Sequence, residues 1–176
     1  KEMINHNSFN NGLLRLMITR GNIEGPIWEY NGSPNIYITI NPLLKTPNEP
    51  VKIIFVNEKD YPIIRFNPAI KSMNYIGNMK AKKDAYKKGA YEPVFYNENK
   101  IITECAIRNI FFIKYKKIYT PELNLGVLPG VMRDTIINIA CKMNLDVIES
   151  SIGFNEINTF DEAFISSSGI GILPCY

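Results

Sequence analysis

The chain has 176 residues, of which 45% are hydrophobic, and a formal net charge of +3. This length and apolar content suffice for one domain of ordinary size or for the larger part of a two-domain protein. The small charge, without a recognition motif or regularly spaced stacking aromatic residues, argues against nucleic-acid binding. No stretch is long and apolar enough to cross a bilayer, so we expect no membrane partner either.

Residues that bind metals or act as nucleophiles are scattered. The three cysteines lie far apart without a CxxC pair, which argues against a zinc site and against a disulfide framework. The single histidine, His6, stands in an Asn-rich run, so histidine metal sites and Ser-His-Asp triads have no basis. The chain starts without an apolar signal core or an initiator Met. We therefore expect a cytoplasmic protein and no metal site, and the missing Met leaves open whether the natural chain starts further upstream or is a divergent short form.

The first third of the chain is expected to contain strands and loops. Short apolar runs at residues 13–18, 36–40 and 51–56 suit buried strands, and the prolines and glycines between them disfavour helix. A stretch with two prolines, residues 57–70, resembles a connection. We predict the remainder of a small N-terminal α+β domain over residues 1–60, an interdomain connection over residues 61–70 and a large domain over residues 71–176.

The large domain is expected to mix helices with an extensive sheet. Apolar positions separated by lysines predict an amphipathic helix over residues 73–88, before Gly89, and helical spacing returns over residues 130–143. Strand signals predict two hairpins, residues 93–96 with 101–103 and residues 110–113 with 118–120. Three further strands are predicted at residues 146–149, 163–165 and 171–173, and a short helix is predicted at residues 154–159. The fold class is α+β, a mixed sheet with two main helices.

Two side chains and one turn offer chemistry. Lys71 lies before the first long helix, and Glu104 lies among apolar neighbours. Because a buried carboxylate without a partner is costly, we expect Glu104 to have a cationic partner. The turn 128–130 leads into the second long helix, whose free N–H groups and dipole would favour a phosphate. An amine, a buried carboxylate and a phosphate site form the set that a pyridoxal 5'-phosphate (PLP) enzyme needs.

Four blocks follow one another in a recognisable order. They are Lys-x-x-Asn-Tyr from Lys71, Thr-Glu-x-x-x-x-Asn-Ile-Phe from Thr103, Thr-Pro-x-Leu-x-x-x-Val-Leu-Pro-Gly-Val-x-Arg from Thr120, and Asp-Glu-x-Phe-x-x-Ser-Ser from Asp161. This order resembles the class IV aminotransferase family, which contains branched-chain aminotransferases, D-amino acid aminotransferases and aminodeoxychorismate lyases. The match runs from about Arg15 to the C-terminus. The resemblance implies PLP fold type IV, PLP as the cofactor, an amino-acid-like substrate and a homodimer.

The resemblance also implies roles for individual residues. Lys71 stands at the Schiff-base lysine, which also moves a proton at the substrate α-carbon. Glu104 matches the carboxylate that faces the pyridine nitrogen and holds it protonated. Tyr75 matches the tyrosine that hydrogen-bonds the phenolic oxygen of the cofactor, although a core tyrosine is the alternative interpretation. Leu128 would lie against the face of the ring.

Other matched positions concern the phosphate and the substrate. Gly130, Val131 and Met132 align with the turn that holds the phosphate, and many relatives have Thr where this chain has Met132, so only backbone amides would serve there. Ser168 matches a position near the phosphate, and Ser167 one near the substrate carboxylate. Arg20 recurs in the family without an assigned role, and either a structural ion pair or a substrate contact would explain it.

The family's N-terminal stretch, which carries the arginine that clamps the phosphate, has no counterpart before Arg15, so part of the small domain is expected to be missing. Two reactions remain open. Residues 131–133 and 103–105 favour 4-amino-4-deoxychorismate lyase, which releases pyruvate and 4-aminobenzoate for folate biosynthesis. Residues 74–75 favour a branched-chain or D-amino acid aminotransferase, and we lean to the lyase. A hypothesis of another class is an inactive, truncated fold-IV domain that binds an amine-bearing ligand or a protein partner.

Overall fold

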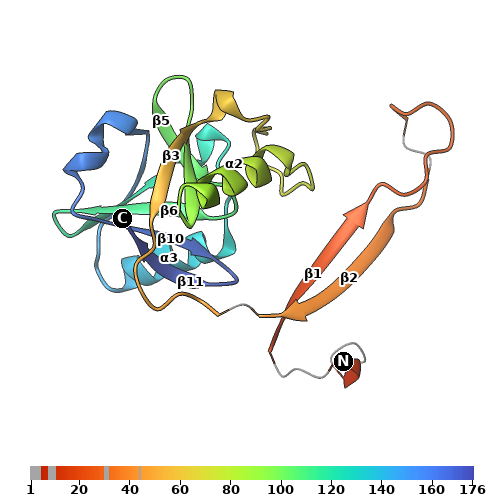
Figure 1. Ribbon diagram of the computed structural model, residues 1–176, viewed down its shortest axis with the longest axis horizontal. Coiled ribbons are helices and arrows are strands. Elements are labelled where there is room, and N and C mark those ends of the chain that lie inside the picture. The colour runs from red at the N-terminus through yellow and green to blue at the C-terminus, as the bar shows by residue number, and fades with distance from the viewer. Residues whose placement is uncertain (1–4, 8–10, 30–31, 44) are drawn as a thin grey trace. The chain divides into compact units, whose positions relative to one another are not determined.

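The computed structural model describes residues 5–7, 11–29, 32–43 and 45–176. Contacts divide the chain into two compact units, Lys1–Lys45 and Thr46–Tyr176. In the first unit, β1 (Gly12–Thr19) pairs with β2 (Asn35–Pro42) along its whole length as an antiparallel hairpin (Figure 1). Both strands carry the apolar runs from which they were predicted, so the two strands are confirmed. The prediction that they are buried is wrong, because most of their side chains are exposed.

The second unit contains two sheets (Figure 1). The first has the strand order β11-β10-β6-β7-β8, and the second has the order β3-β4-β5-β9. The first consists of β6 (Asn109–Lys114), β7 (Lys117–Pro121), β8 (Val147–Ser150), β10 (Glu162–Ser167) and β11 (Gly171–Cys175). The second consists of β3 (Ile53–Asn57), β4 (Glu92–Tyr96), β5 (Ile101–Cys105) and β9 (Ile152–Gly153). The predicted hairpins are therefore present as β4–β5 and β6–β7.

Two helices and three short 3₁₀ turns complete the second unit. The helices are α2 (Ile76–Lys87) and α3 (Val131–Lys142), and the turns are η1 (Glu58–Asp60), η2 (Leu123–Leu125) and η3 (Phe154–Thr159). Helix α2 begins three residues later than the predicted residue 73, because Asn74 N–H is bonded to Ser72 Oγ at 3.2 Å in a turn before it. Among the described residues, no helix is both long and apolar enough to cross a membrane.

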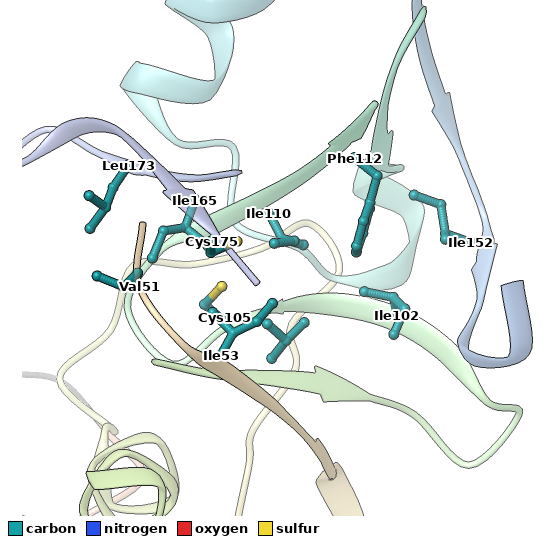
Figure 2. Packing of buried hydrophobic residues seen from close by; sticks show 11 residues of the cluster. Val51, Ile53, Ile102, Cys105, Ile110, Phe112, Ile152, Ile165, Leu173 and Cys175 are labelled. Carbon is teal, nitrogen blue, oxygen red and sulfur yellow. The ribbon is translucent and has the colours of Figure 1, made fainter. Parts of the chain in front are cut away.

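The main hydrophobic core lies between the two sheets (Figure 2). Successive side chains of a strand point to opposite faces, so the buried strands carry apolar residues on both sides. On β4, Val94 faces this core while Phe95 packs with Ala81 of α2. On β6, Phe112 faces the core while Phe111 packs with Ile136 of α3. The layers are therefore α2, four-stranded sheet, five-stranded sheet and α3, and the predicted α+β class is confirmed.

The contacts divide the chain earlier than the sequence predicted. Residues 46–60 were assigned to the small N-terminal part, with a connection over residues 61–70. In the structure β3 pairs in parallel with β4, and Val51 N–H donates to the carbonyl of Pro174 at 3.0 Å. The physical reason is burial: Ile53 and other apolar side chains of β3 lie in the core between the sheets and under α2.

Candidate active site

Glu104 lies near the end of β5 with its side chain only 14% exposed. Its Oε2 accepts a hydrogen bond from the backbone N–H of Leu128 at 3.1 Å, and its Oε1 pairs with Arg65 Nη1. Burial raises the pKa of the Glu104 carboxyl, against the lowering effects of Arg65 and of the Leu128 N–H. Arg65 therefore supplies the cationic partner expected for this carboxylate.

Arg65 serves a second carboxylate as well. Its Nη2 and Nε donate to Glu58 Oε1 at 2.5 Å and 3.0 Å, and its Nη2 also donates to Thr103 Oγ1 at 3.0 Å. Thr103 Oγ1 donates in turn to Glu58 Oε1 at 2.6 Å. Sequence reasoning missed Arg65 and Glu58, because they lie 39 and 46 residues before Glu104 and no spacing rule links them. Only the prediction of a cationic partner pointed toward them.

The turn 128–130 is held against strand β6. Asn109 Nδ2 donates to the carbonyl of Leu128 at 2.9 Å. Gly130 is the residue that caps α3, and a Cβ atom there would lie 2.1 Å from Asn109 Oδ1. Any side chain at position 130 would therefore force the Asn109 side chain to move. No side chain caps α3 at Gly130, and the first-turn N–H groups of a helix have no partner within the helix.

A buried hydroxyl lies on the same side of the five-stranded sheet. Ser166 is fully buried, and its Oγ has no hydrogen-bond partner among the described residues. It is paired with Asn109 across β10 and β6, so both side chains leave the same face. By alternation this is the face that Phe111 and Phe164 present to α3. The sequence analysis named Ser167 and Ser168 but not this neighbour.

Val131 and Met132, the other residues predicted to hold the phosphate, differ in burial. Val131 is 76% exposed, whereas Met132 packs against the cluster under α3. Met132 therefore contributes to packing. Ser167 is half-buried at the end of β10, opposite Gly171, and Ser168 is exposed in the turn that follows. The structure places these residues without assigning a ligand to them.

Lys71 and Tyr75 form a separate pair before α2. Lys71 is exposed, and its Nζ donates to Tyr75 Oη at 3.2 Å. Tyr75 precedes the first residue of the helix, and its carbonyl accepts the N–H of Met79 at 2.8 Å. One turn further along, Asn78 Nδ2 donates to the carbonyl of Ala106 at 2.8 Å. That bond links the helix after Tyr75 to the loop that directly follows β5 and Glu104.

Arg20 and the surface cavities are not part of the groups described above. In the first unit, the guanidinium of Arg20 donates to the carbonyls of Ile27 and Glu29 at 2.7 Å and 2.5 Å. Two surface cavities of about 360 and 290 Å³ border η3 and contain none of the predicted site residues. The structure thus joins Glu104 to Leu128, holds Leu128 and Gly130 against Asn109, and joins Lys71 to Tyr75. Among the described residues, no recorded bond links Lys71 to Glu104.

Replacing Gly130 by alanine is expected to lower the free energy of unfolding by about 1–3 kcal/mol, because the added methyl group would displace Asn109 from its bond to Leu128. Urea unfolding followed by circular dichroism measures the difference. Gly169→Ala is the matched control, since no atom lies within 4 Å of a Cβ built at Gly169. Equal stabilities of the two variants would contradict the close approach of α3 to β6.

Comparison with known proteins points to one family. The chain is 29% identical over 179 residues to a putative branched-chain-amino-acid aminotransferase of Methanocaldococcus jannaschii, covering 99% of this chain and 62% of that protein. It is 34% identical over 105 residues to an aminodeoxychorismate lyase of Bacillus subtilis, covering 60% of this chain and 36% of that protein.

Solved structures share the fold. A putative 4-amino-4-deoxychorismate lyase from Legionella pneumophila matches with a TM-score of 0.86 at 24% identity, over 99% of this chain and 63% of that one. A branched-chain aminotransferase from Thermoproteus uzoniensis matches with a TM-score of 0.84 at 24% identity, over 99% of this chain and 60% of that one. These matches confirm the predicted PLP fold type IV. The chain spans less than two thirds of the length of each of these relatives. Since the model of the family described as amino-transferase class IV matches residues 1–176, the chain belongs to the class IV aminotransferases.

Proposed function

We propose that this chain is part of a PLP-dependent enzyme that acts on an amino-acid-like substrate through Lys71, with 4-amino-4-deoxychorismate lyase as the first candidate activity. The observation that carries the proposal is the environment of Glu104: a buried carboxylate held by Arg65 and by the N–H of Leu128, which lies two residues before Gly130, the capping residue of α3. A carboxylate in such a position is what a protonated pyridine nitrogen requires.

The residues present fit PLP, which class IV aminotransferases and aminodeoxychorismate lyase use as their cofactor. The cofactor has a phosphate, and the N-terminus of α3 lacks a side-chain cap while Ser166 Oγ is buried without a partner among the described residues. Amides and a hydroxyl of this kind are suitable phosphate ligands. The cofactor also has a basic ring nitrogen, for which Glu104 is the matching acid, and an aldehyde, for which Lys71 is the matching amine.

Bound PLP would supply an aldehyde that captures amines and a ring that accepts electrons from the substrate α-carbon. The protein side chains would do the rest. Lys71 would hold the cofactor covalently and then carry the proton between the substrate and the medium. Tyr75, in contact with Lys71 Nζ at 3.2 Å, would hold the phenolic oxygen on the side where the amine acts. Glu104 would keep the ring nitrogen protonated.

The lyase is the first candidate because residues 103–105 and 131–133 resemble those of lyases. The lyase reaction would release pyruvate and 4-aminobenzoate, which would place the protein in folate biosynthesis. The second candidate, a branched-chain or D-amino acid aminotransferase, is favoured by Asn74-Tyr75 and by the relative in Methanocaldococcus jannaschii, which covers 99% of this chain.

Substrate assays separate these activities. We expect the protein, incubated with PLP and 4-amino-4-deoxychorismate, to release pyruvate, detected by coupling to lactate dehydrogenase. Transfer of nitrogen from leucine or D-alanine to 2-oxoglutarate, in a protein that releases no pyruvate from 4-amino-4-deoxychorismate, would reject the lyase in favour of the aminotransferase. A Schiff-base absorbance band without either reaction would support the third hypothesis, an inactive binding domain. Absence of that band would reject the whole proposal.

We also propose that the chain acts as a homodimer in the cytoplasm, as the family resemblance implies. Apolar side chains that are exposed in the single chain, including Ile76 at 79% and Val131 at 76%, are compatible with burial against a second copy. Sedimentation velocity with and without PLP measures the oligomeric state. A monomer at all concentrations would reject the dimer.

A further inference from the structure

The side chain of Glu58, the first residue after β3, accepts several hydrogen bonds from residues of other segments of the chain. It begins the short turn η1, and its side chain is 16% exposed. Its Oε1 accepts hydrogen bonds from Arg65 Nη2 at 2.5 Å, from Arg65 Nε at 3.0 Å and from Thr103 Oγ1 at 2.6 Å. Because Thr103 directly precedes Glu104 on β5, Glu58 is attached both to the partner of Glu104 and to the strand that carries it.

One guanidinium therefore serves two carboxylates. Arg65 offers Nη1 to Glu104 and offers Nη2 and Nε to Glu58. A pair consisting of Arg65 and Glu104 alone would have zero net charge and would do little to retain a proton on a nearby ring nitrogen. With Glu58 the cluster carries one net negative charge, on side chains that are 14–20% exposed, where charges interact more strongly than in bulk water. A protonated ring nitrogen would bring the sum to zero.

We propose that Glu58 is a positioning residue of the cofactor site, which holds Arg65 and offsets its charge so that Glu104 keeps the PLP ring nitrogen protonated. This inference rests on the proposed function, because it requires the ring of PLP beside Glu104. Glu58 lies outside the four blocks that carry the family resemblance. It touches neither Lys71 nor the turn 128–130 in any recorded bond, and acts through Arg65.

The electrostatics of the protein without cofactor agree with this charge count. Burial is the main cause that raises the pKa of Glu104, Arg65 lowers it, and the negative charge of Glu58 raises it. Within the part of the chain that the structure describes, the charged groups recorded as acting on Glu104 are Arg65, from the segment before α2, and Glu58, from η1. Neutralising Glu58 should therefore lower the pKa of Glu104, because Glu104 would then be the only carboxylate in the cluster that pairs with Arg65.

The first test uses PLP labelled with ¹⁵N in the ring, whose chemical shift reports protonation of that nitrogen. In Glu58→Gln we expect the midpoint of ring-nitrogen deprotonation to fall by about one pH unit relative to the wild-type protein. Glutamine retains an oxygen that accepts the bond from Thr103 while the charge is removed. Glu98→Gln is the matched control, since Glu98 is 72% exposed and pairs only with Lys59 among the recorded ion pairs of the described residues. A midpoint unchanged in Glu58→Gln overturns the inference.

The second test needs no cofactor. Carboxyl ¹³C NMR follows the titration of Glu104 in the wild-type protein, in Glu58→Gln and in Glu58→Asp. We expect the pKa of Glu104 to fall in Glu58→Gln and to fall less in Glu58→Asp, whose shorter carboxylate retains part of the charge. Glu58→Asp also serves if the glutamine variant does not fold. An unchanged Glu104 titration in the folded variants overturns the coupling.

The two failures are distinguishable. If wild-type protein forms no Schiff base with PLP, the proposed function fails and the role at the ring nitrogen fails with it. If the Schiff base forms and both titrations ignore Glu58, the proposed function stands and only this inference fails.

Discussion

Replacing Lys71 by alanine is expected to abolish the Schiff-base absorbance of the protein with PLP. Lys71 is the amine that stands at 3.2 Å from Tyr75 Oη, next to the N-terminus of α2. Loss of its proton transfer alone should reduce turnover by roughly 10²–10⁴-fold. Borohydride reduction followed by peptide mass spectrometry should place the phosphopyridoxyl group on Lys71 in the wild-type protein and remove it in Lys71→Ala.

The lysines of α2 provide the control for this experiment. Lys87 is exposed and lies 3.7 Å from Asp84, so Lys87→Ala should retain the absorbance band and the turnover. A phosphopyridoxyl label on Lys82 or Lys87 instead of Lys71 would refute the assignment of the amine. A label distributed over several surface lysines would indicate nonspecific reaction and would refute it equally.

Replacing Arg65 by methionine is expected to lower the free energy of unfolding by about 3–5 kcal/mol at neutral pH. The physical reason is that Glu58 and Glu104, with side chains 16% and 14% exposed, would lose the cation that they share. Methionine occupies a similar volume, so packing loss contributes little. Urea unfolding measures the change. The double variant Arg65→Met with Glu104→Gln should recover part of the loss, because one of the two unpaired charges is then removed.

The deficit of Arg65→Met should depend on pH. Burial raises the pKa of Glu104 in the folded state above its ordinary value of 4.5. In the window between 4.5 and this raised pKa, the folded state binds more protons than the unfolded state. The stability that Glu104 contributes is therefore fully present below pH 4.5 and falls as pH rises through the raised pKa. Without Arg65 the pKa of Glu104 rises further and the window extends upward. The deficit should be largest at neutral pH and shrink on acidification.

A surface cation supplies the matched control. Lys59 is 61% exposed and pairs with Glu98 at 3.2 Å, so Lys59→Met should change the unfolding free energy by no more than about 0.5 kcal/mol. A deficit of Arg65→Met that is as small as that of Lys59→Met, or one that does not vary with pH, would contradict the shared ion pair.

Local patterns carried most of the secondary structure. The apolar runs at residues 110–113 and 118–120 lie on β6 and β7, and helical spacing located α3 to within one residue at each end. The start of α2 was less predictable, because the turn at Ser72 competes with the first helical turn. The burial of Glu104 also followed from its neighbours, since apolar residues flank it on β5.

Pairings between strands that are far apart in the sequence could not be predicted from local patterns. The division of the chain after Lys45 depends on β3 joining β4. The unpartnered hydroxyl of Ser166 depends on the register of β10 against β6. The periodicity of a single strand contains no information on strand order or register, so these two features could be known only from the tertiary structure.

By itself, the sequence determined the α+β class, the places of most strands and helices and the family, and it led us to propose Lys71 and Glu104 as the amine and the acid. Only the tertiary structure decided that Arg65 is the cation beside Glu104, that Glu58 shares it, and that Gly130 is required by its contact with Asn109. The physical reason is range: periodicity and turn chemistry act over a few residues, whereas an ion pair between Arg65 and Glu104 spans 39 residues and exists only once the strands are assembled.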